Sequence, residues 1–204
     1  DAIKAVMTDE SLDPAFRALV LGLPSEDDIA QTLFDAGQTP HPQKIHAARQ
    51  RLRQTLAIHL SDACPTLFRQ LETPTFVPDA DGSGKRSLRM AVLGLMTLND
   101  GGEAARALYA KADNMTEQLG SLSALLAAGL GAEEIQAFEK KWKNDRLVMD
   151  KWFTMQVVHA APDSTATTVE ALTQHPDFTL RNPNRFRAVF GALTANHAGF
   201  HHAS

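Results

Sequence analysis

Apolar side chains recur every three or four positions along much of the chain, which is the spacing of one face of an α-helix. One such stripe, formed by Met115, Leu119, Leu122 and Leu126, ends at Gly129. No stretch of the sequence shows the sustained apolar–polar alternation that is typical of strands. The pattern therefore predicts an all-α fold.

Prolines, glycines and capping residues divide this pattern into short helices. Asp13 and Asn182 each stand before a proline, an arrangement that favours the first turn of a helix. Ser25 precedes three acidic residues and predicts a helix that stops at Gly37. Further helices are predicted over residues 42–61, 65–71, 114–129, 132–143, 145–159 and 165–174, with two more ending near residues 99 and 111. Short helices with short connections predict stacked antiparallel helix pairs, an armadillo- or HEAT-like α-solenoid, in a single helical domain over residues 1–204.

Three segments depart from the regular pattern. Residues 73–84 contain two prolines and two glycines and predict a loop without regular structure. Residues 145–159 are apolar almost all round, with a narrow polar stripe, so this helix is expected inside a larger assembly of helices. Residues 196–204 show neither a helix nor a cap, and we expect that the chain has been cut from something longer.

The composition excludes several classes of protein. The chain has 204 residues with 20 basic and 24 acidic side chains, a formal net charge of −4, which gives no electrostatic reason to expect nucleic acid or a membrane as a partner. The sequence lacks a run of about 20 apolar residues that would predict a membrane span. Cys64 is the single cysteine, which excludes an intrachain disulfide and a cysteine-based zinc site and fits a cytoplasmic protein.

Sequence motifs for catalysis are scarce. The chain has no G-x-S-x-G nucleophile elbow, phosphate-binding loop or dinucleotide fingerprint. His197 and His201 are four residues apart, but a zincin helix needs a glutamate directly after the first histidine, and Ala198 stands there. We therefore expect no catalytic residue and no metal ligand in this chain, and we interpret Cys64 as a small buried residue. A small metalloenzyme that uses His197, His201 and His202 is a competing hypothesis.

Basic residues gather in several places along the sequence. Three clusters are interpreted as solvated helix faces: residues 49–53, 85–89 and 140–143. Arg185 and Arg187 differ, because they fall in the first turn of the helix that Asn182 begins, where the helix dipole disfavours a cation by about 0.3–1 kcal/mol. Such a guanidinium either meets a ligand carboxylate or forms a structural ion pair with an acid on a neighbouring helix.

Two specific segments carry a resemblance to a known family: residues 141–153 (KWKNDRLVMDKWF) and residues 182–187 (NPNRFR). Weaker blocks are residues 114–116 (NMT) with 122–125 (LSAL), 23–25 (LPS) and 85–89 (KRSLR). The blocks follow family order over essentially the whole chain and resemble the C-terminal domain of bacterial aminopeptidase N. One departure is Met90, where the family pattern has asparagine.

The resemblance implies a fold of stacked helices and, as the longer parent, a zinc metallopeptidase that removes N-terminal residues from peptides. Family members carry H-E-x-x-H and G-x-M-E-N motifs in a catalytic domain, and neither motif occurs in these 204 residues. The resemblance thus implies a chain that is inactive alone, contacts the catalytic domain of the same polypeptide and walls the cavity that admits short peptides. It further implies that Arg187 binds substrate there, whereas Arg185 points to the opposite helix face and pairs within the domain.

A free-standing helical-repeat scaffold, which would bind a partner along a concave face, is the alternative interpretation. Such a scaffold needs polar capping helices at both ends. The apolar helix predicted at residues 145–159 does not favour it.

Overall fold

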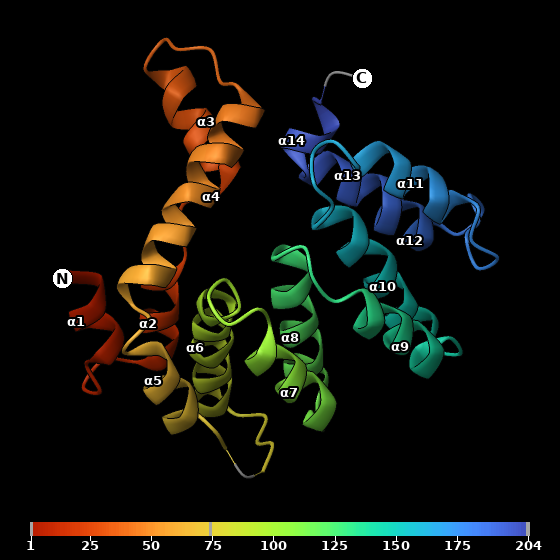
Figure 1. Ribbon diagram of the computed structural model, residues 1–204. Coiled ribbons are helices and arrows are strands. Elements are labelled where there is room, and N and C mark those ends of the chain that lie inside the picture. Colours follow the sequence, from red (N-terminus) through yellow and green to blue (C-terminus); the bar gives the residue numbers. More distant parts are fainter. Residues whose placement is uncertain (1, 74, 203–204) are drawn as a thin grey trace. The chain divides into compact units, whose positions relative to one another are not determined.

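The computed structural model describes residues 2–73 and 75–202, and every regular element in these two ranges is a helix (Figure 1). The predicted all-α fold is therefore confirmed. The chain divides into two compact units, which are described separately: unit 1 holds residues 1–24 and 49–128, and unit 2 holds residues 25–48 and 129–204. Within the described ranges, none of the helices combines the length and apolar character that crossing a bilayer requires.

Unit 1 is built around one long helix, α6 (Ala80–Met96), which packs against α2, α5 and α8. The other helices of this unit are α1 (Ala2–Thr8), α2 (Pro14–Leu21), the second part of α4 (Pro42–His59), α5 (Cys64–Gln70), α7 (Glu103–Lys111) and α8 (Met115–Ala127). α7 and α8 lie side by side (Figure 1). A core cluster joins α1, α2, α4, α5 and α6 through the buried side chains of Met7, Leu21, Leu56, Ala57, Leu60, Cys64, Leu67, Leu71, Leu88, Val92 and Leu95.

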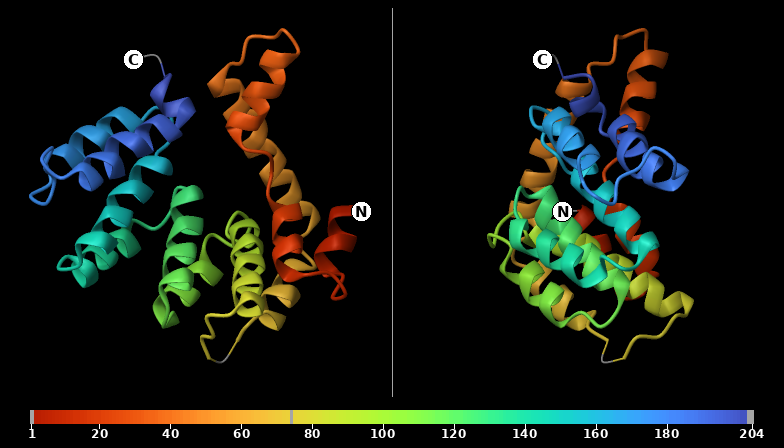
Figure 2. Two further views of the ribbon diagram at one scale, coloured as in Figure 1. Left: turned by 180° about the vertical axis from the view of Figure 1, so that it is seen from behind. Right: turned by 90° about the vertical axis from the view of Figure 1, so that its right-hand side faces the viewer.

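Unit 2 is built around α10 (Arg146–Val158), which contacts helices on several sides. The remaining elements are α3 (Glu26–Asp35), the first part of α4, α9 (Ala132–Trp142), α11 (Thr165–Thr173), α12 (Pro183–Phe186), the π-helical turn η1 (Arg187–Gly191), α13 (Ala192–Ala195) and α14 (His197–Phe200). α9, α11, η1 and α13 all pack on α10, and the blue ribbons of Figure 2 show α11 beside the segment that holds α12 and α13.

The helix starts predicted from capping residues are confirmed. The Asp13 carboxylate accepts hydrogen bonds from the backbone N–H groups of Ala15 and Phe16 at 2.8 and 3.1 Å. Ser25 and Asp28 form a reciprocal capping box at the start of α3. These bonds satisfy backbone donors that the first turn of a helix leaves without an intrahelical acceptor.

The prediction of a loop over residues 73–84 is wrong at its C-terminal end, because α6 already begins at Ala80. The Asp79 carboxylate accepts from the Gly82 N–H at 2.7 Å and caps the first turn. A Cβ on Gly82 would lie 2.7 Å from the Val77 carbonyl oxygen, and a Cβ on Gly84 would lie 3.2 Å from the backbone nitrogen of Ala15 in α2. The two glycines therefore permit close packing of a helix rather than the freedom of a loop.

The prediction that residues 196–204 lack a helix and a cap is also wrong within the described residues. Residues 197–200 form α14, and the Asn196 side chain accepts from the Gly199 N–H at 3.0 Å. The same amide donates to the carbonyls of Val157 and Ala160, each at 2.9 Å. The cap itself is local, because Gly199 follows Asn196 by three residues, whereas the other partners of the amide lie more than thirty residues away along the chain. Residues 203–204 lie outside the described residues.

Replacing Gly82 with alanine should destabilise unit 1 by about 1–3 kcal/mol, the usual cost of overpacking, because the new methyl group would press on the Val77 carbonyl and the Asp79 carboxylate. Urea unfolding followed by circular dichroism measures the change. Gly94→Ala is the matched control in the same helix, since a Cβ there would meet only the Arg53 Nη2 at 3.7 Å. We expect the control to be neutral or stabilising by up to about 1 kcal/mol. Equal losses in both variants would contradict the steric explanation.

Candidate functional site

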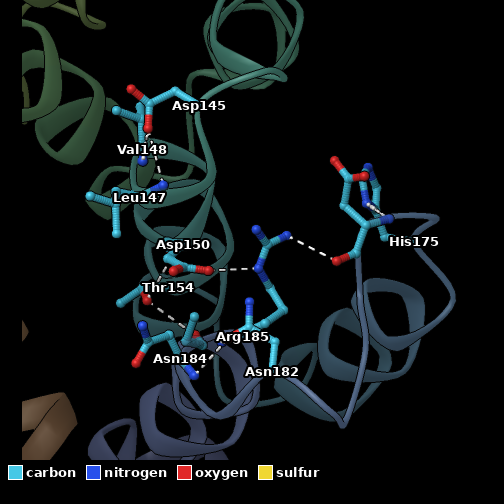
Figure 3. A network of polar contacts seen from close by, with 11 residues as sticks. Asp145, Leu147, Val148, Asp150, Thr154, His175, Asn182, Asn184 and Arg185 are labelled. Carbon is cyan, nitrogen blue, oxygen red and sulfur yellow. Dashed lines mark hydrogen bonds and ion pairs between the residues drawn. The ribbon is translucent and has the colours of Figure 1, made fainter.

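Arg185 in α12 is held by three neighbours, and Figure 3 shows its contact with one of them, Asp150. Its Nε donates to the Oδ1 of Asp150 in α10 at 2.6 Å, and its Nη1 donates to the Asp177 carbonyl at 3.2 Å. The guanidinium carbon lies 4.3 Å from the centroid of the Phe153 ring. The side chains of Arg185 and Asp150 are 4% and 19% exposed, so solvent screens this ion pair only weakly. The predicted pairing of Arg185 within the domain is confirmed.

An aromatic cluster fixes the ring on which Arg185 stacks. Phe153 makes edge-on contacts with Trp152 and His175, with ring centroids 4.9 and 5.2 Å apart. The indole Nε1 of Trp152 donates to the Ile135 carbonyl at 2.9 Å, which ties α10 to α9. The His175 Nε2 lies 3.1 Å from Glu139 Oε1. This network orients α10, and with it Asp150, toward α12.

The helix that carries Arg185 and Arg187 is irregular. The Asn182 side chain accepts from the backbone N–H groups of Asn184 and Arg185 at 3.0 and 3.4 Å, which confirms the predicted helix start. At Arg187 the helix widens into the π-helical turn η1. The Ala188 carbonyl in this turn accepts from the Thr154 hydroxyl of α10 at 3.1 Å (Figure 3). π-helical turns of this kind are frequent at functional sites.

The polar stripe of the apolar helix explains this arrangement. Asp150 and Thr154, which lie one turn apart on α10, form hydrogen bonds with α12 and η1. Leu147, on a different face of α10, is 70% exposed. A polar side chain on an otherwise apolar helix is thus the sequence signal for the partner of Arg185. The identity of that partner could not be read from the sequence, because Arg185 follows Asp150 by 35 residues.

Arg187 differs from Arg185 in its surroundings. Its side chain is exposed at the first residue of η1, and among residues 2–73 and 75–202 its guanidinium has no hydrogen-bond or ion-pair partner. Arg185 anchors the same helix to α10, so the backbone that presents Arg187 is fixed. The assignment of Arg187 to substrate binding stays a prediction.

The interpretation of residues 85–89 as a solvated face is wrong for both arginines, which are buried. Arg86 donates to the Val77 carbonyl at 3.0 Å and lies over the Phe76 ring. Arg89 forms an ion pair with Glu117 and lies over the Phe68 ring. The aromatic partners come from other segments of the chain, so the local sequence did not reveal them. Residues 140, 141 and 143, by contrast, are exposed.

The histidines and the cysteine were the other candidates for chemistry. His197 Nε2 lies 2.9 Å from Asp27 Oδ1, and in the part of the chain that the structure describes no three His, Cys, Asp or Glu side chains are grouped so that they could hold a metal ion. These residues therefore do not fit a zinc site. Cys64 is buried in the core, as predicted, and burial followed by the nearby Asp62 charge raises the pKa of its thiol to about 11. A thiol with this pKa is poorly nucleophilic at neutral pH.

Comparison with known proteins gives matches over the whole chain. The family model described as "Domain of unknown function (DUF3458_C) ARM repeats" matches residues 1–204. Aminopeptidase N of Caulobacter vibrioides is 38% identical over 211 residues, which cover 100% of this chain and 24% of the relative. Aminopeptidase N of Escherichia coli is 37% identical over 98% of this chain and 23% of the relative. The chain thus spans about a quarter of the length of the curated relatives that it matches.

A solved structure gives the same result. A crystal structure of Legionella pneumophila aminopeptidase A in complex with aspartic acid matches with a TM-score of 0.82 and 26% identity, over 97% of this chain and 24% of that chain. The resemblance to aminopeptidases that was stated from residues 141–153 and 182–187 is therefore confirmed, as is the armadillo-like class of fold.

Arg185→Ala should destabilise unit 2 by about 3 kcal/mol, near the lower end for a broken buried ion pair, because Asp150 keeps some contact with water. Arg187→Ala should change the free energy of unfolding by less than about 0.5 kcal/mol, as is usual for an exposed side chain without partners. Thermal or urea unfolding of both variants measures the difference. A comparable loss in Arg187→Ala would show that Arg187 has a structural role.

Proposed function

This chain belongs to the DUF3458_C family of ARM-repeat domains, and on that premise we propose that it is the C-terminal helical part of a zinc-dependent aminopeptidase. In this role it covers the active-site cavity of the longer protein and forms part of its wall. The observation that carries the proposal is the match of 97–100% of this chain to about a quarter of each of several aminopeptidases.

We infer that the reaction centre of the longer protein lies outside this chain. The parent's zinc ion would supply the Lewis acid for peptide hydrolysis, and its ligands would come from the rest of the longer polypeptide. Residues 2–73 and 75–202 offer no grouping of side chains for that metal. We therefore assign to this chain a contact with the catalytic domain of the same polypeptide, and we place the parent in the cytoplasm, where the single buried thiol of Cys64 is compatible with reducing conditions.

Arg187 is proposed to contact the carboxylate of a short peptide substrate. An exposed guanidinium that no described residue pairs with is available to a ligand, and its planar fork matches a carboxylate in two-point hydrogen bonding. The buried ion pair of Arg185 supports this proposal. It attaches α12 to α10, so Arg187 is not needed to hold the helix in place.

The free-standing scaffold is the less favoured function. Each of the aminopeptidases named above contains the matching region as a fraction of a longer enzyme. The metalloenzyme hypothesis based on His197, His201 and His202 gains no support from the geometry, since His197 lies beside Asp27 and not within a set of ligands among the described residues.

The proposal is tested by titrating this chain into a separately expressed catalytic portion of a matching aminopeptidase. Calorimetry and alanyl-anilide hydrolysis are followed together. We expect saturable binding with altered turnover, because the cover and the catalytic domain share a cavity wall, and no zinc-dependent hydrolysis by the chain alone. Hydrolysis by the pure chain would contradict the proposal. A folded chain that binds no catalytic portion would also count against it.

Arg187→Ala in the full-length protein should lower kcat/KM for short peptides by about 10- to 100-fold, the effect of losing a charge-assisted hydrogen bond worth about 1.5–3 kcal/mol. Hydrolysis of an aminoacyl anilide should change by less than about 2-fold, because an anilide lacks the carboxylate. Steady-state kinetics on both substrates measure the difference. Arg181→Ala removes an exposed arginine six residues earlier and is the matched control. Equal losses on peptide and anilide would indicate a structural role for Arg187.

A further inference from the structure

Buried arginines in this chain reach acceptors on other elements. Arg17 in α2 donates twice to the Met7 carbonyl, from Nε at 2.9 Å and from Nη2 at 2.6 Å. Arg86 donates to a carbonyl, and Arg89 and Arg185 pair with carboxylates. Each of these four guanidinium groups therefore meets at least one oxygen atom, as the cost of burying an unpaired charge requires, although the Nε of Arg89 is buried without a hydrogen-bond partner.

Arg53 in α4 differs from these arginines, because solvent reaches its guanidinium nitrogens. It precedes the core residues Leu56 and Ala57 by three and four positions, so it lies on the packed face of the helix, and its side chain is half-buried. Its Nη2 lies 3.7 Å from the place that a Cβ on Gly94 of α6 would occupy. Among the residues that the structure describes, no hydrogen bond, ion pair or aromatic contact engages the Arg53 guanidinium.

Arg49 places a second positive charge one turn away on the same face of α4. Its Nε donates to the Pro24 carbonyl at 2.9 Å, which fixes the side chain and leaves the terminal nitrogens of the guanidinium for other acceptors. Burial, and then the charge of Arg49, lower the pKa of Arg53. An arginine remains protonated in spite of such a shift, so Arg53 carries a positive charge that no acidic side chain among the described residues pairs with.

We propose that Arg53, assisted by Arg49, binds a carboxylate group beside Gly94 of α6. The planar guanidinium fork donates two parallel hydrogen bonds to a carboxylate, and the missing side chain of Gly94 lets the fork lie close to α6. The formal net charge of −4 disfavours a polyanion such as nucleic acid as the source. The carboxylate belongs either to a peptide C-terminus or to an aspartate or glutamate side chain. This inference does not rest on the proposed aminopeptidase function.

The test uses the 204-residue chain labelled with ¹⁵N-arginine. The Nε–Hε signals are followed by NMR while sodium acetate replaces sodium chloride at constant ionic strength. We expect a saturable shift of the Arg53 signal and a parallel rise in the midpoint of thermal unfolding, because a ligand that binds the folded state stabilises it. Chloride alone should produce neither effect. The absence of a saturable change in the Arg53 signal would by itself overturn the proposal.

Variants and further probes sharpen the result. Arg53→Gln should abolish the rise in the unfolding midpoint with acetate, and Arg49→Gln should weaken it. Arg51→Gln removes the same charge from the exposed side of α4 and should leave the rise unchanged. An undiminished rise in the unfolding midpoint of Arg53→Gln would refute the site.

Trialanine and N-acetyl-glutamate amide then distinguish the two sources of the carboxylate. Tighter binding of trialanine supports a peptide C-terminus, and tighter binding of N-acetyl-glutamate amide supports an acidic side chain. No enzyme activity is measured, so a failure here leaves the aminopeptidase proposal intact.

Discussion

Short helices depend on side chains from their neighbours, and in this fold the strongest constraint on those contacts is the burial of arginine. An isolated helix of a few turns is marginal in water, so tertiary packing supplies most of its stability. Long arginine side chains let one helix reach the backbone or the carboxylates of another, as Arg17, Arg89 and Arg185 do. Each such contact fixes both the position and the rotation of the helix that carries the arginine, because the rigid guanidinium donates hydrogen bonds in only a few directions. The remaining apolar contacts are less directional.

The ion pair between Arg185 and Asp150 connects this constraint to function. It joins α12 to α10, and the hydrogen bond from the Thr154 hydroxyl to the Ala188 carbonyl joins η1 to the same helix. These two contacts hold the backbone on both sides of Arg187 and leave its side chain exposed. A residue proposed to bind a substrate benefits from such a support, since a fixed backbone lowers the entropy that binding must otherwise remove. The cluster of Phe153, Trp152 and His175 stiffens the opposite side of the pair.

Close packing between helices at glycine residues is the second feature on which the fold depends. Gly82 and Gly84 let the start of α6 approach the preceding segment and α2, and Gly199 brings α14 against Thr165. In the sequence, paired glycines near prolines predict a loop, because glycine is also the residue of flexible turns. The same residue serves both purposes, and only its neighbours in space distinguish them. Arg86 and Arg89 illustrate the same ambiguity for charged residues, since a local basic cluster looks solvated until its aromatic partners are known.

The sequence by itself determined the all-α class, the caps at Asp13, Ser25 and Asn182, and the burial of Cys64, because these follow from periodicity and from interactions within a few residues. Its family blocks also led to the aminopeptidase resemblance and to the different roles expected of Arg185 and Arg187. The tertiary structure alone decided which acid meets Arg185, that the Asn196 amide reaches the carbonyls of Val157 and Ala160, and that Arg53 lacks a partner among the described residues. The physical reason is distance along the chain. Hydrogen bonds and ion pairs act over a few ångströms, and the folded chain brings together groups that the sequence separates by tens of residues.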